Sequence, residues 1–135
     1  MNKRILLKNA KIVNEGSIFD GDLLIINDRI EKIATHISDS NAQIIDCQGL
    51  YLMPGCIDDQ VHFREPGLTH KATIHSESRA AVAGGITTFM EMPNTKPATL
   101  THALLEDKYH IASKSSIANY SFYMGTSNEN YDDLM

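Results

Sequence analysis

Cysteine and long apolar runs are both scarce in this sequence. Its two cysteines, Cys47 and Cys56, are too few for the disulfide framework of a small secreted domain, and neither lies in a C-x-x-C spacing. No stretch approaches the roughly 18 consecutive apolar residues of a membrane span. At the N-terminus, Lys8, Asn9 and Lys11 interrupt the apolar run before it can form a signal-peptide core. We therefore expect a cytoplasmic protein with reduced thiols and no membrane partner.

Basic charge is scarce as well. The 12 Lys and Arg residues are outnumbered by 17 Asp and Glu residues, which gives a net charge of -5. The longest basic cluster is the pair Lys3-Arg4. Because nucleic-acid binding requires clustered basic side chains, the sequence argues against a nucleic-acid partner.

The first part of the chain shows the pattern of a small β domain. Short apolar segments alternate with turn residues, and no helical period is sustained over residues 4–54. Strands are predicted at residues 23–26, 30–33, 43–46 and 51–53. Asn27-Asp28 tolerates positive φ and predicts a tight hairpin, and Gln48-Gly49 predicts a second turn. We place this β module at residues 1–54.

After Pro54-Gly55 the predicted elements alternate between strands and helices. The predicted strands are 57–62, 86–92 and 117–124, and the predicted helices are 73–83 and 101–115, with the start of a third helix over 128–135. Gly84-Gly85 is a helix stop signal, and Thr101 suits a helix N-cap. This alternation is typical of parallel βα units and predicts an α/β fold over residues 55–135.

Chain length sets a limit on this fold. Three parallel strands leave an open sheet edge, which is a poor stopping point. A closed (β/α)8 barrel needs roughly 250 residues, whereas this chain has 135. We therefore expect the chain to be truncated.

The polar residues at the end of the strand predicted at 57–62 are candidates for a functional site. Strand side chains alternate between faces, so Gln60 and His62 are predicted to point the same way, with Arg64 just beyond. A neutral imidazole could bind Zn²⁺, oriented by a carboxylate such as Asp58, and a guanidinium matches a carboxylate ligand. One histidine is short of the three or four ligands that zinc needs. The residues alone leave open a solvated histidine and a surface arginine.

Two sequence blocks resemble a known family. PGCIDDQVHFREPG, residues 54–67, resembles the dihydroorotase motif P-G-x-I-D-x-H-x-H-x-R-x-P-G. EMPNTKP, residues 91–97, resembles that family's second block, and SRAAVAGGITT, residues 78–88, resembles its first helix and second strand. The chain therefore resembles the N-terminal portion of a class I-like dihydroorotase of the amidohydrolase superfamily. The resemblance implies a small β module followed by the first three βα units of a (β/α)8 barrel, which is incomplete in this chain.

The resemblance also implies residue roles. It makes His62 a zinc ligand, and it makes Arg64 and Asn94 the residues that hold the substrate carboxylate. Gln60 stands where the family's first histidine is expected, and an amide oxygen is a weak zinc ligand beside imidazole. The family's general base and other ligands for its one or two Zn²⁺ ions come from later strands. We therefore expect no catalytic residue within this chain, and no activity from the isolated chain.

The activity implied is the reversible hydrolysis of dihydroorotate to N-carbamoyl-L-aspartate in pyrimidine synthesis, by a homo-oligomer. One alternative is another cyclic amidohydrolase, such as an allantoinase or hydantoinase. Arg64 with Asn94 argues against it, because the pair suits an exocyclic carboxylate. A second alternative is a metal-free, dihydroorotase-like structural partner of aspartate transcarbamoylase. Gln60 supports that reading, whereas the retained substrate anchor opposes it.

Overall fold

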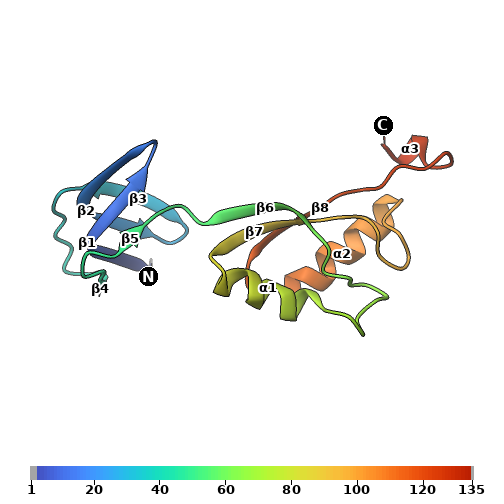
Figure 1. Cartoon of the computed structure of the whole chain (residues 1–135), viewed down its shortest axis with the longest axis horizontal. Helices are drawn as coiled ribbons and strands as arrows, with labels where there is room; N and C mark the ends of the chain where they lie inside the picture. The colour runs from blue at the N-terminus through green and yellow to red at the C-terminus, as the bar shows by residue number, and fades with distance from the viewer. Residues whose placement is uncertain (1–2, 135) are drawn as a thin grey trace. The chain divides into compact units, whose positions relative to one another are not determined.

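The structure, a computed structural model, describes residues 3–134. These residues form two compact units, which divide between Pro54 and Gly55 (Figure 1). The first unit is built from strands, and the second combines strands with helices. None of the helices in the described part of the chain is long and apolar enough to cross a membrane.

The first unit is one sheet organised around its first strand. Its strands are β1 (Arg4–Asn14), β2 (Ser17–Ile26), β3 (Arg29–Ala34), β4 (Gln43–Asp46) and β5 (Tyr51–Leu52). β1 pairs antiparallel with β2 and parallel with both β4 and β5, while β3 pairs antiparallel with β2. Asn27 has a φ of 57° in the hairpin between β2 and β3, as its residue type predicts. Sequence patterning located four of these strands but did not identify β1 as the central strand.

A buried carboxylate links β1 and β2 to the segment that follows β3. Asp22 on β2 is 2% exposed and accepts hydrogen bonds from the backbone N–H groups of Asn9 and Ile37, each at 2.9 Å. Asn9 lies where the register between β1 and β2 shifts, and its φ is 57°. Burial alone would raise the pKa of Asp22, but the two amide donors and the Lys8 ammonium hold the pKa below its ordinary value.

The second unit contains three parallel strands with helical connections. The elements are β6 (Cys56–Val61), α1 (Ile74–Ala83), β7 (Ile86–Glu91), α2 (His102–Ser115), β8 (Asn119–Phe122) and α3 (Tyr131–Leu134). The sheet order is β6-β7-β8, and both pairings are parallel. Thr73 and Thr101 are the N-caps of α1 and α2, each accepting a hydrogen bond from a backbone N–H three residues later. The predicted βα alternation is confirmed.

Both longer helices pack on one face of this sheet (Figure 1). The buried core between the two layers consists of Phe63, Ile74, Phe89, Ala112 and Phe122. The rings of Phe63 and Phe89 lie 4.4 Å apart between centroids, and Phe122 meets Phe89 edge-on at 6.4 Å. This contact fixes the segment that follows β6, because Phe63 lies just beyond the end of that strand.

Replacing Asp22 with alanine should destabilise the first unit. The change leaves the N–H groups of Asn9 and Ile37 without their acceptor, and we expect a loss of about 2 to 3 kcal/mol in the free energy of unfolding. Urea unfolding of the complete protein, followed by circular dichroism, measures this. Asp20→Ala is the matched control, since Asp20 pairs with Lys11 at the surface with 80% of its side chain exposed. Equal unfolding midpoints for the two variants would contradict the prediction.

Candidate functional site

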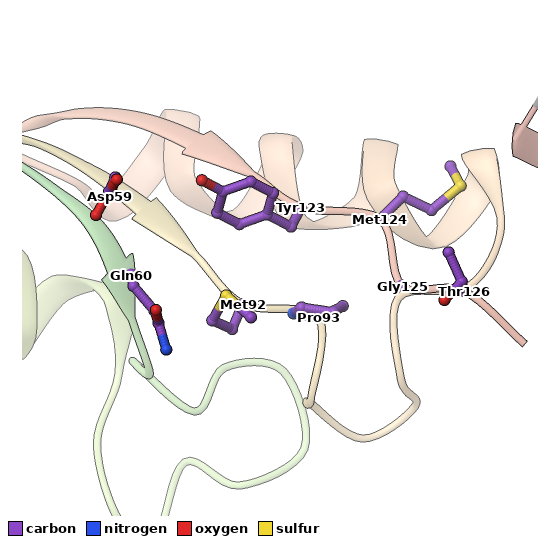
Figure 2. A pocket seen from close by; sticks show the side chains of 8 residues that line it. All are labelled: Asp59, Gln60, Met92, Pro93, Tyr123, Met124, Gly125 and Thr126. Atoms are coloured by element: carbon purple, nitrogen blue, oxygen red, sulfur yellow. The ribbon is translucent and has the colours of Figure 1, made fainter.

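A pocket of about 440 Å³ lies at the carboxyl ends of β6, β7 and β8 (Figure 2). It is lined by Asp59, Gln60, Met92, Pro93, Tyr123, Met124, Gly125 and Thr126. These residues come from β6 and from the segments that follow β7 and β8. In (β/α)8 barrels the active site forms at this end of the strands. The pocket is therefore where a reacting site is expected.

An irregularity in β6 shapes one wall of the pocket. Asp58 pairs with Phe89 and Val61 pairs with Glu91, so three steps along β6 match two steps along β7. As a result, two consecutive residues, Asp59 and Gln60, both line the pocket (Figure 2). Strict alternation, from which Gln60 and His62 were predicted to share a face, does not extend across this irregularity. That shared face stays a prediction.

His62 and Asn94 bring the two sequence blocks together. Nδ1 of His62 lies 2.9 Å from Oδ1 of Asn94, although 32 residues separate them. An amide oxygen only accepts hydrogen bonds, so this contact requires a proton on Nδ1; in the neutral ring that tautomer has its lone pair on Nε2. Asp58, which was expected to orient the histidine, instead accepts a hydrogen bond from Gln60 N at 3.2 Å. No hydrogen bond between Asp58 and His62 is found within residues 3–134, and the orienting role of Asp58 stays a prediction.

The loops that carry the two blocks also meet through their backbones. Lys96 N donates to Pro66 O at 3.2 Å. Gly67 has a φ of 81°, and a Cβ at this position would collide with the Lys96 carbonyl oxygen. The proline and glycine of the first block therefore provide the close approach that the second block needs.

Arg64 follows His62 in a conformation that is uncommon for a residue with a side chain. Its φ is 73°, and its backbone N donates to Glu91 Oε1 at 3.0 Å. Within residues 3–134 no carboxylate forms an ion pair with its guanidinium. The backbone of Arg64 is thus tied to Glu91, and its guanidinium has no acidic partner among residues 3–134.

Glu91 and Lys108 form a buried ion pair behind the site. Their side chains are 1% and 0% exposed, and Oε2 lies 2.9 Å from Nζ. Lys108 Nζ also donates to Met92 O at 3.1 Å and lies 4.9 Å from the Phe122 ring centroid. Burial raises the pKa of Glu91 and lowers that of Lys108, while the contact between them opposes both shifts.

Sequence reasoning assigned no role to this pair. A signal was present on α2, where Leu104, Lys108 and Ala112 recur at helical spacing, so that the lysine lies in an apolar stripe. A charge in such a stripe requires a buried partner. Glu91 entered the sequence analysis only as the first residue of the EMPNTKP block, with no role assigned to its carboxylate.

The described residues do not complete a metal site. No group of three His, Cys, Asp or Glu side chains within residues 3–134 is placed to hold a metal ion. His62 offers one imidazole nitrogen, whereas zinc takes at least three protein ligands. Any zinc site that includes His62 therefore needs ligands beyond this set.

Comparison with known proteins agrees with this geometry. The family described as Dihydro-orotase-like matches residues 49–130. The dihydroorotase of Lactococcus lactis subsp. lactis is 48% identical over 115 residues, covering 84% of this chain and 27% of that protein. The dihydroorotase of Streptococcus thermophilus is 40% identical over 130 residues, covering 95% of this chain and 30% of that protein. This chain therefore spans less than a third of the length of these relatives.

A solved structure gives the same result for the fold. The L-hydantoinase (dihydropyrimidinase) from Arthrobacter aurescens superposes with a TM-score of 0.92 at 29% identity, covering 99% of this chain and 30% of that one. The predicted β module followed by an incomplete amidohydrolase barrel is confirmed. Because the family match covers more than half of the sequence, the chain belongs to the dihydro-orotase-like family.

Proposed function

We propose that this chain forms part of a dihydroorotase, which hydrolyses dihydroorotate reversibly to N-carbamoyl-L-aspartate in pyrimidine synthesis. The observation that carries the proposal is the 2.9 Å contact between His62 and Asn94. It brings the two blocks to one edge of the sheet, beside Arg64. Relatives named dihydroorotase share 40 to 48% identity with this chain, which supports the same assignment.

The substrate carboxylate is proposed to bind between Arg64 and Asn94. A guanidinium presents two parallel N–H donors that match a carboxylate. The Oδ1 atom of Asn94 is engaged by His62, so its Nδ2 group is left to donate to the ligand. One asparagine side chain would thus orient the imidazole and contact the substrate. Holding the ring at two points limits its rotation before attack.

Zinc, one or two ions per subunit, is the proposed cofactor, and it would act as a Lewis acid toward the ring amide. His62 Nε2 would be one ligand, with its orientation set by Asn94. The other ligands and the general base are proposed to lie outside the described residues. No hydrolytic step is assigned to the side chains of residues 3–134.

A hydantoinase is the second candidate, because solved structures with that name share this fold. Hydantoin has no exocyclic carboxylate, so it would leave the proposed Arg64 and Asn94 anchor without a partner. Comparing turnover of dihydroorotate, allantoin and hydantoin by the complete protein separates these candidates. Preference for hydantoin would favour the second.

A cytoplasmic location and an assembled state of the protein are also proposed. Cys47 and Cys56 are free thiols, which is consistent with the proposed cytoplasmic location because reducing compartments keep thiols unpaired. A homo-oligomeric state and association with aspartate transcarbamoylase stay predictions from the resemblance.

Arg64→Lys should weaken dihydroorotate binding although it conserves charge. An ammonium cannot reproduce the two parallel hydrogen bonds of the guanidinium, and we expect KM to rise about ten- to a hundredfold, equivalent to about 1.5 to 3 kcal/mol. Steady-state kinetics of the complete protein measure this. Arg79→Lys, on the exposed surface of α1, is the matched control. An unchanged KM for Arg64→Lys would remove Arg64 from the site.

Gln60→His should raise the zinc content of the complete protein. The residue lines the pocket, and the substitution replaces a weak amide ligand with an imidazole near His62. Elemental analysis after dialysis gives zinc per chain for the parent and the variant, with Gln43→His, at an exposed position of β4, as the control. A parent without zinc or activity, and a variant no better, would support the metal-free structural protein instead.

A further inference from the structure

We propose that Glu91 and Lys108 are positioning residues that together hold the two segments of the carboxylate anchor, residues 62–64 and 92–94. This inference rests on the proposed function, because it assigns Glu91 and Lys108 to the proposed substrate anchor. Neither side chain reaches solvent, so neither can touch the substrate itself. Each instead contacts the backbone of one anchor segment.

Glu91 holds the first anchor segment. Its carboxylate accepts a hydrogen bond from the backbone N–H of Arg64, at 3.0 Å to Oε1. Arg64 is in the left-handed region with a φ of 73°, where a residue with a Cβ needs support from its surroundings. The Phe63 ring is buried against Phe89 in the core. The segment that carries Arg64 is thus held at two points, the Arg64 backbone N–H and the buried Phe63 ring.

Lys108 holds the second anchor segment. Its ammonium donates to the carbonyl oxygen of Met92 at 3.1 Å, two residues before Asn94. The N–H of Met92 donates to Val61 O at 3.0 Å. Both backbone polar groups of Met92 are therefore hydrogen-bonded. Because Glu91 Oε2 lies 2.9 Å from Lys108 Nζ, a shift of either side chain would move both segments.

Stability alone does not account for this arrangement. A buried ion pair adds little net stability, because desolvation of the two charges offsets their attraction, and apolar residues of similar size often replace it without loss. An apolar residue at position 91, however, would leave the N–H group of Arg64 without this acceptor. The pair is therefore best explained by the backbone groups that it fixes next to Arg64 and Asn94.

Two double variants of the complete protein separate positioning from a general structural role. Glu91→Leu with Lys108→Met removes both charges and every backbone contact of the pair. Glu91→Gln with Lys108→Met also removes the charges, but retains an acceptor for the Arg64 N–H. Tyr109→Phe is the control, because it removes the 3.1 Å contact between the Tyr109 hydroxyl of α2 and Ser121 Oγ without touching the pair.

The first readout compares two ligands of the same ring type. Dihydrouracil lacks the carboxylate of dihydroorotate, so we expect its inhibition constant not to depend on the Arg64 guanidinium. We expect the Leu/Met variant to raise KM for dihydroorotate on the order of 10- to 100-fold, with the inhibition constant of dihydrouracil changed by less than about twofold. The Gln/Met variant keeps the acceptor for the Arg64 N–H but not the contact from Lys108 to Met92 O, so it should recover only part of the loss. Tyr109→Phe should alter neither constant. Equal increases of both constants in the Leu/Met variant would overturn the proposal.

The second readout does not depend on turnover. Amide hydrogen exchange of the parent should be slower at Arg64 than at the exposed Thr69 of the same loop, since Glu91 accepts from the Arg64 N–H. Exchange at Arg64 should accelerate in the Leu/Met variant and stay slow in the Gln/Met variant. Fast exchange at Arg64 in the parent overturns the positioning role even if no variant folds. A parent that does not hydrolyse dihydroorotate would refute the proposed function, and exchange would still decide the role of the pair.

Discussion

In a parallel sheet the chain leaves every strand at the same edge, and β6 and β7 pair in this way. His62 and Asn94 each follow one of these strands, so a separation of 32 residues becomes a distance of 2.9 Å. The hydrogen bond between Lys96 and Pro66 adds a second link between the same two loops. Without parallel pairing, the two sequence blocks would be separate polar loops; with it, they form one side of a pocket.

The local features of this fold were within reach of the sequence because a few neighbouring residues determine them. Thr73 and Thr101 cap helices because a hydroxyl can accept from a backbone N–H three residues later. Asn27 turns the chain because its side chain tolerates positive φ. The alternation of strands and helices predicted parallel units, and the comparisons confirmed the fold.

The contacts that shape the candidate site were harder to predict, because they depend on residues far apart in the chain. The irregularity in β6 is defined only by its pairing with β7, and the partner of His62 in the structure is Asn94, on another element. The partner of Lys108, Glu91, lies on β7. The sequence of α2 therefore indicates that the lysine is buried, but it does not identify the group with which the lysine pairs. Residue types were informative about chemistry, whereas tertiary pairing determined which groups meet.

The extra residue in β6 also determines which face of the sheet the end of the strand presents to each side. Between the Asp58–Phe89 and Val61–Glu91 pairs, β6 has one residue more than β7, which offsets the extra β7 residue between the Cys56–Ile86 and Ile57–Thr88 pairs. Deleting Asp59 or Gln60 would change the face on which Val61 lies and would shorten the connection to Phe63, which packs in the aromatic core. A substitution at Asp59 or Gln60 leaves the number of residues, and so the register with β7, unchanged. We therefore expect this segment to tolerate a substitution far better than a deletion. A glutamine can occupy position 60 while the residues of the anchor keep their positions.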